Sequence, residues 1–100
     1  GKSDGLYGVE TEGDRRGTSK LFFRCPVGAE LCGPCFSADG ETLFLAVQHP
    51  GTDGTKHLKG FNRPSTFDDP ATRWPDFDTS LPPRPSVVVV TKKGGGKIAN

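Results

Sequence analysis

The chain has 100 residues, which is enough for one small domain. Its net charge of +1, from 13 basic and 12 acidic side chains, excludes a strongly basic nucleic-acid-binding protein and an acidic tail protein. Hydrophobic residues make up only 32% of the chain, beside 14 glycines and 9 prolines, so the core must be small. A domain of this size usually needs a disulfide, a bound metal or a partner to be stable.

Residues 1–26 predict a β-hairpin. Leu6–Thr11 is a short strand candidate, and the polar, glycine-containing segment Glu12–Gly17 is typical of a turn. Lys20–Cys25 is the expected return strand, because its side chains divide between two faces with a period of two.

Residues 27–50 predict a second hairpin. Its strands are Cys35–Ser37 and Thr42–His49, joined by the turn Ala38–Gly40, and an Asp-Gly pair between two apolar runs is a strong hairpin signal. The second strand is apolar on both faces, a pattern that favours a sheet covered on both sides.

Residues 51–85 form a long connection of 35 residues, beyond the length at which loops become uncommon in compact domains. Asp69–Trp74 suits a single helical turn, because Asp stands at a capping position and Pro at the first helical position. The aromatic side chains of the connection predict that it folds onto an apolar surface; they are Phe61, Phe67, Trp74 and Phe77.

Residues 86–100 predict a third hairpin, with strand Ser86–Lys92, turn Gly94–Gly96 and return strand Lys97–Ala99. The longest aliphatic run, Val87–Val90, is too short to cross a bilayer, so no membrane insertion is expected. Taken together, the pattern predicts an all-β fold in a single domain, with antiparallel hairpins forming about one and a half blades of a β-propeller.

Three cysteines, Cys25, Cys32 and Cys35, cannot all pair with one another, which argues against a secreted disulfide scaffold. Cys32-Gly33-Pro34-Cys35 matches the redox motif of thioredoxins, but the following residues predict a strand, whereas that chemistry needs a helix N-terminus to lower the thiol pKa. A dithiol oxidoreductase is therefore an alternative function, although the residues around the motif do not suit it.

A zinc site is a further alternative. The three cysteines could combine with His49 or His57, although only one pair has the close spacing of tetrahedral zinc sites. Glu30, at the start of the second hairpin, is the candidate for a metal-facing carboxylate, because inner propeller strands begin near the central opening and hard cations take oxygen ligands from several loops. The other interpretation of Glu30 is a solvated loop carboxylate.

Catalytic residues are not indicated by the sequence. His49 is more typical of a hydrogen-bonded strand end than of a ligand or general acid. Arg63, Arg73 and Arg84 could contact phosphate, but three arginines in a loop of this length are ordinary. No nucleophile with an adjacent base can be picked out, so no catalytic or cofactor-binding residue is assigned.

An ordered set of segments carries a family likeness. Residues 28–51 (GAELCGPCFSADGETLFLAVQHPG), with STF at 65–67, TRWPDF at 72–77 and PPRPSVVVV at 82–90, resemble the C-terminal end of PhoX-type secreted alkaline phosphatases. Residues 6–17 resemble the hairpin that precedes it. The likeness covers nearly the whole chain.

The resemblance implies a bacterial, periplasmic or secreted phosphomonoesterase whose propeller holds calcium and iron at its central opening. Glu30 matches the family's Gly-Ala-Glu position, which favours a metal-facing role. The absence of methionine predicts that the chain is cut from a longer protein, so its partners would be the remaining blades, and the 100 residues alone are expected to be inactive and to bind neither metal stably. The alternative function is a stand-alone β-rich module that binds a protein or ligand.

Overall fold

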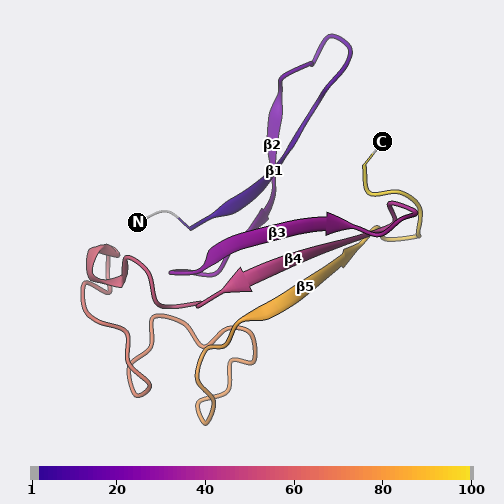
Figure 1. Cartoon of the computed structure of the whole chain (residues 1–100). Coiled ribbons are helices and arrows are strands. Elements are labelled where there is room, and N and C mark those ends of the chain that lie inside the picture. The colour runs from indigo at the N-terminus through magenta and orange to yellow at the C-terminus, as the bar shows by residue number, and fades with distance from the viewer. Residues whose placement is uncertain (1–2, 100) are drawn as a thin grey trace.

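The computed structural model describes residues 3–99, and the chain is all-β apart from one short 3-10 turn in that range (Figure 1). Five strands form two antiparallel sheets. The first sheet pairs β1 (Gly5–Val9) with β2 (Ser19–Arg24), and the second has the order β3-β4-β5, with β3 at Glu30–Phe36, β4 at Thr42–Gln48 and β5 at Ser86–Thr91. The 3-10 turn η1 spans Thr55–His57. The all-β prediction is confirmed.

The first two predicted hairpins are present, and the turn of the second is held by side chains. Ser37 Oγ donates to Asp39 Oδ1 at 2.6 Å, and the same oxygen accepts the Glu41 N–H at 3.0 Å. Gly40 follows with φ of 73°, a conformation that glycine adopts without the penalty paid by other residues. The Asp-Gly signal therefore placed this turn correctly.

A bulge in β3 places two thiols on one face of the sheet. Cys32 pairs with Ala46 and Cys35 pairs with Phe44, so three steps along β3 match two steps along β4. Because residues 44 and 46 share a face, Cys32 and Cys35 share it too. The bulge also accommodates Pro34, which has no N–H to donate and occurs on edge strands.

The core lies on the other face of β4. Leu43, Leu45 and Val47 are 2%, 0% and 1% exposed, whereas Phe44 on the opposite face is 38% exposed. The remaining buried hydrophobic residues are Cys25 and Ala29, with Phe23, Leu31, Trp74 and Val88 packed against the cluster that they form with Val47. In the chain by itself one face of the sheet is left uncovered, because too few residues remain to cover it, so cover of that face by neighbouring blades stays a prediction.

The long loop docks through one aromatic residue only. Trp74 packs against the core, but Phe67 and Phe77 are exposed, and the Phe61 ring lies 3.8 Å below the guanidinium of Arg63. The predicted folding of the loop onto an apolar surface holds at Trp74, while the three phenylalanines are not among the residues packed against the core. Cation–π contacts with arginine account for two of the three phenylalanines, the second being Phe67 under Arg73.

The helical turn expected at Asp69–Trp74 is absent. The Asp69 carboxylate binds Arg63 instead of capping a helix, and Thr66 Oγ1 accepts the Asp69 N–H at 3.1 Å. Ser65 Oγ accepts the Ala71 N–H at 3.0 Å. Short polar side chains thus satisfy the backbone donors that a helix would have used.

The return strand expected at Lys97–Ala99 is also absent, so the third hairpin does not form within the described residues. Gly94, Gly95 and Gly96 all have φ between 84° and 89°, and the chain after them turns toward the β3–β4 hairpin. There the Ile98 N–H donates to Gly40 O at 3.0 Å. Successive left-handed glycines therefore direct the chain away from β5.

The molecule is extended. Its radius of gyration is 16.1 Å, against about 13 Å for a compact chain of 100 residues. Its accessible surface is 7052 Å², against about 5,500 Å² for a compact monomer of 10.7 kDa. Figure 1 shows the reason, because the β1–β2 hairpin projects away from the three-stranded sheet. Within residues 3–99, no helix has the length and apolar character needed to cross a lipid bilayer.

Candidate functional site

A tight backbone junction at Gly28 brings together the start of β3 and the segment after β4. Gly28 O accepts the N–H groups of Thr52 at 3.2 Å and Asp53 at 3.0 Å, and Val27 O accepts the Gly51 N–H at 2.7 Å. Gly28 has φ of 69°, and a Cβ at this position would lie 2.7 Å from Thr52 N. Only glycine fits this junction without displacing backbone atoms.

The junction places Glu30, His49 and Asp53 in one polar cluster. His49 Nε2 lies 3.4 Å from Glu30 Oε2, and His49 Nδ1 lies 3.8 Å from Asp53 Oδ2 and 3.4 Å from Gly28 O. His49 has φ of 33°, so its backbone occupies the left-handed region that few non-glycine residues adopt. The turn after β4 thus holds the imidazole between two carboxylates.

These contacts change the acid–base behaviour of His49. Partial burial of the ring lowers its pKa, but the charge of Asp53 and the hydrogen bonds to Glu30 and Gly28 O outweigh that effect, so the pKa of His49 is raised. The protonated imidazole is the form that both carboxylates favour. The exposed fraction of the His49 side chain is 34%, so solvent screens these interactions.

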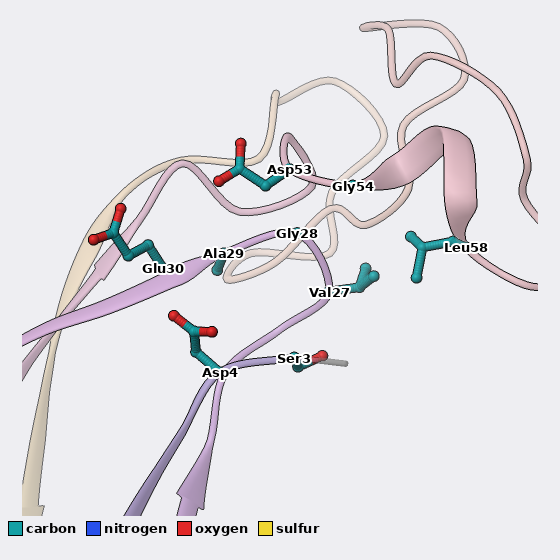
Figure 2. Close-up of a pocket in the computed structure, with 9 residues that line it drawn as sticks. All are labelled: Ser3, Asp4, Val27, Gly28, Ala29, Glu30, Asp53, Gly54 and Leu58. Atoms are coloured by element: carbon teal, nitrogen blue, oxygen red, sulfur yellow. The ribbon is translucent and has the colours of Figure 1, made fainter. Parts of the chain in front are cut away.

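Glu30 also borders an acidic pocket of about 370 Å³, shown in Figure 2. Asp4 enters it from the residue before β1, where Asp4 Oδ2 accepts the Leu31 N–H at 3.2 Å, and Asp53 enters it from the turn after β4. The full lining is Ser3, Asp4, Val27, Gly28, Ala29, Glu30, Asp53, Gly54 and Leu58. Three carboxylates from three segments therefore border one pocket.

Glu30, the predicted metal-facing residue, thus lies at the start of β3 with two further carboxylates across the pocket. The sequence reasoning missed Asp4 and Asp53 as its neighbours. The turn glycines Gly28 and Gly51 were the only signal that could have indicated the junction. Among residues 3–99, no three His, Cys, Asp or Glu side chains gather closely enough to hold a metal ion.

The three thiols are all free and do not gather around either histidine as a metal-binding group within the described residues. Cys25 is buried, Cys35 is exposed, and Cys32 Sγ donates to Glu30 Oε1 at 3.4 Å. Burial, the hydrogen bond to Glu30 and the charges of Glu30 and Asp4 raise the pKa of the Cys32 thiol. A thioredoxin-like site needs a lowered thiol pKa at a helix N-terminus, whereas Cys32 lies in a strand, which argues against the redox interpretation.

The three loop arginines bind groups of the loop itself. Arg63 and Arg84 each form two-point contacts with a carboxylate, Asp69 and Asp76 respectively. Arg73 donates to the carbonyl oxygens of Leu81 and Phe67, both at 2.9 Å. These side chains therefore organise the loop and do not converge on the acidic pocket.

Comparison with known proteins gives one match. The family model described as Alkaline phosphatase PhoX matches residues 1–51, which include β1 to β4, Gly28 and Glu30. No curated protein and no solved structure matches the chain. The likeness of the segments after Gly51 to the same family stays a prediction.

Proposed function

The chain belongs to the PhoX alkaline phosphatase family, and on that premise we propose that it is the C-terminal structural portion of a metal-dependent enzyme that hydrolyses phosphate monoesters. The single observation that carries the proposal is the family match over residues 1–51. The matched segment contains Glu30, Gly28 and Asp4 of the acidic pocket, whereas Asp53, Gly54 and Leu58 follow just after it.

Glu30 is the proposed metal-facing residue. Carboxylate oxygens are the ligands that Ca²⁺ prefers, and the pocket offers them from Asp4, Glu30 and Asp53. The set fits calcium in donor type but does not form a closed ligand group among residues 3–99, so the remaining ligands, and those of iron, would come from other segments of the full-length protein. When bound, such ions polarise a phosphoryl oxygen and supply a nucleophilic water or hydroxide.

The residues around Glu30 have a positioning role in this proposal. His49 Nε2 contacts one carboxylate oxygen and Cys32 Sγ contacts the other, so both oxygens of the carboxylate have a partner. Outer contacts of this kind orient metal-binding side chains. The Gly28 junction fixes the backbone on which Glu30 is carried.

The remaining blades of the full-length protein are the proposed partners. The extended shape and the exposed face of the β3-β4-β5 sheet support that proposal, because propeller blades are covered on both faces by their neighbours. Family membership supports export of the full-length protein to the periplasm or beyond the cell.

The experiment compares the 100-residue chain with the full-length phosphatase in the hydrolysis of a chromogenic phosphate monoester, with calcium and iron supplied to both. The expected result is turnover by the full-length protein and none by the chain, because a cation held at a propeller opening needs ligands from several blades. Turnover by the chain at a rate close to that of the full-length protein would contradict the proposal.

A second candidate function is a β-rich interaction module. It is favoured by the apolar residues exposed on one sheet face, where Val87 is 66% and Val89 57% exposed. Exposed apolar surface of this kind marks binding faces. A module of this kind would be stable and would bind its ligand without any other part of the phosphatase, whereas the first proposal requires the remaining blades.

A further inference from the structure

We propose that the free edge of β5 is an interface with a second copy of this chain, in which two β5 strands pair antiparallel about a twofold axis at Val89. The two three-stranded sheets then form one six-stranded sheet. The inference concerns the 100-residue chain by itself and does not depend on phosphatase activity.

The outer edge of β5 is unprotected. It stands last in the order β3-β4-β5, and β4 is the only strand of residues 3–99 that pairs with it (Figure 1). Its six residues are Ser86, four valines and Thr91, with neither a charge nor a proline among them. Natural edge strands are usually blunted by charged residues, proline or bulges, because bare edges pair with other chains.

The opposite edge of the same sheet shows such protection. β3 contains Pro34 and a bulge between Cys32 and Cys35, and its first residue is Glu30. A strand added along β3 would meet a missing N–H and a broken ladder. The contrast between the two edges directs strand addition to β5.

β5 is also complementary to itself in one register. Opposed residues of two paired strands point to the same face of the sheet, so odd-numbered residues must pair with odd-numbered ones and even with even. A twofold axis normal to the sheet satisfies this condition when it passes through residue 88, 89 or 90. An axis at Val88 would bring Pro85 opposite Thr91, and an axis at Val90 would bring Lys92 opposite Val88. An axis at Val89 pairs Val89 with its copy, Val87 with Thr91 and Val88 with Val90. In this register neither Pro85 nor Lys92 lies opposite a valine.

This register also completes an apolar row on the exposed face. Phe44 pairs with Val89 inside each sheet, so the row runs from Phe44 through the two Val89 side chains to the second Phe44. Val89 is 57% and Phe44 38% exposed in the single chain, and adjacent β-branched and aromatic side chains stabilise a sheet. The two Lys92 residues lie at opposite ends of the junction, so no like charges face each other.

The exposed area of the chain is large enough for such an interface. The chain exposes 7052 Å², about 1,500 Å² more than a compact monomer of its mass. A standard interface covers about 800 Å² per partner, so the chain has more spare surface than one such interface requires.

The first measurement is the molar mass of the 100-residue chain in solution, by sedimentation or light scattering near 100 μM, a concentration at which weak dimers form. A dimer is expected. Val89→Lys should raise the dimer dissociation constant about tenfold or more, because it opposes two cations at the axis. The matched control is Val9→Lys on β1, a valine of similar exposure at 54%, which should leave the constant unchanged.

The second measurement is disulfide trapping, which does not depend on the fold tolerating a lysine. Val89→Cys should be cross-linked to its copy by oxidised glutathione, with two thiols losing electrons and the oxidant giving two reduced glutathiones. Val87→Cys is the control, because its copy would lie about 14 Å away along the ladder, beyond disulfide reach. Peptide mapping separates both links from those of the native cysteines.

A dimer that links at residue 89 in preference to residue 87 supports the proposal. A monomer, an assembly larger than a dimer, a dimer unaffected by Val89→Lys, or equal linking at residues 87 and 89 would overturn it.

Discussion

Glu30 Oε2 and His49 Nε2 lie 3.4 Å apart, one residue beyond the rung at which Glu30 pairs with Gln48. The contact joins the start of β3 to the turn after β4. Asp53 approaches the other ring nitrogen at 3.8 Å, so the imidazole bridges two carboxylates that border the pocket. The pH dependence of the chain should therefore carry a contribution from this histidine.

Stability should fall with rising pH through His49. The contacts raise the folded-state pKa above the ordinary value of 6.5, so the stabilisation is fully present below that pH and is lost as the pH rises through the raised pKa. The free energy of unfolding of the native chain should exceed that of His49→Gln more at about pH 5.5 than at about pH 8.5. His57→Gln is the control, and an equal difference at both pH values would contradict the assignment.

Gly28→Ala should destabilise the chain by about 2–4 kcal/mol, because the new Cβ meets backbone atoms and φ is positive. The Cβ would lie 2.7 Å from Thr52 N and 2.9 Å from the carbonyl carbon of Gly51. Gly54→Ala is the matched control, since Gly54 has φ of 64° but nothing within 4 Å of its Cβ position. It should cost only about 1–2 kcal/mol in urea unfolding. Equal costs would show that the close approach at Gly28 is unimportant.

Trp74→Ala should destabilise the chain by about 2–3 kcal/mol, because Trp74 is the aromatic residue that anchors the long loop on the core. Phe77→Ala, at a side chain that is 71% exposed, should change stability by less than about 0.5 kcal/mol. Denaturant titration followed by circular dichroism measures both. A large cost at Phe77 with none at Trp74 would mean that the loop docks in a different way.

Thiol alkylation should distinguish the three cysteines. Exposed Cys35 should react fastest and buried Cys25 slowest, while Cys32 is slowed because burial and Glu30 raise the pKa of its thiol. Glu30→Gln should accelerate alkylation of Cys32 and leave the Cys35 rate unchanged, as mass spectrometry of the labelled peptides would show. A Cys32 thiol that outpaces Cys35 in the native chain would restore the redox interpretation.

Local signals in the sequence predicted the hairpins well. The Asp39-Gly40 pair and the apolar run along residues 42–48 are local features, and the turn and the strand that they predict are both present. The bulge at Cys32 to Cys35 was not predicted, because it depends on pairing with β4. The predicted start at Cys35 consequently missed the first five residues of β3, which begins at Glu30.

Non-local contacts explain the errors. The Asp69 carboxylate was predicted to cap a helix and binds Arg63, and Ile98 was predicted to pair with β5 and bonds to Gly40. At the site, the sequence singled out Glu30 as a metal-facing residue, which stays a prediction, and it did not indicate the neighbours Asp4 and Asp53. These come from distant segments: the Gly28 junction brings in Asp53, and the hydrogen bond from the Leu31 N–H holds Asp4. Sequence spacing contains no information about such a junction.

The most direct test of the account is the effect of Glu30→Gln on the full-length phosphatase, measured as hydrolysis of a phosphate monoester together with bound calcium and iron. The matched control is Glu12→Gln, an exposed glutamate in the β1–β2 turn. The account predicts that Glu30→Gln lowers both activity and metal content by about tenfold or more, because losing a residue that binds or orients a metal ion has an effect of that size. Glu12→Gln should lower neither. Full activity and full metal content in Glu30→Gln would contradict it.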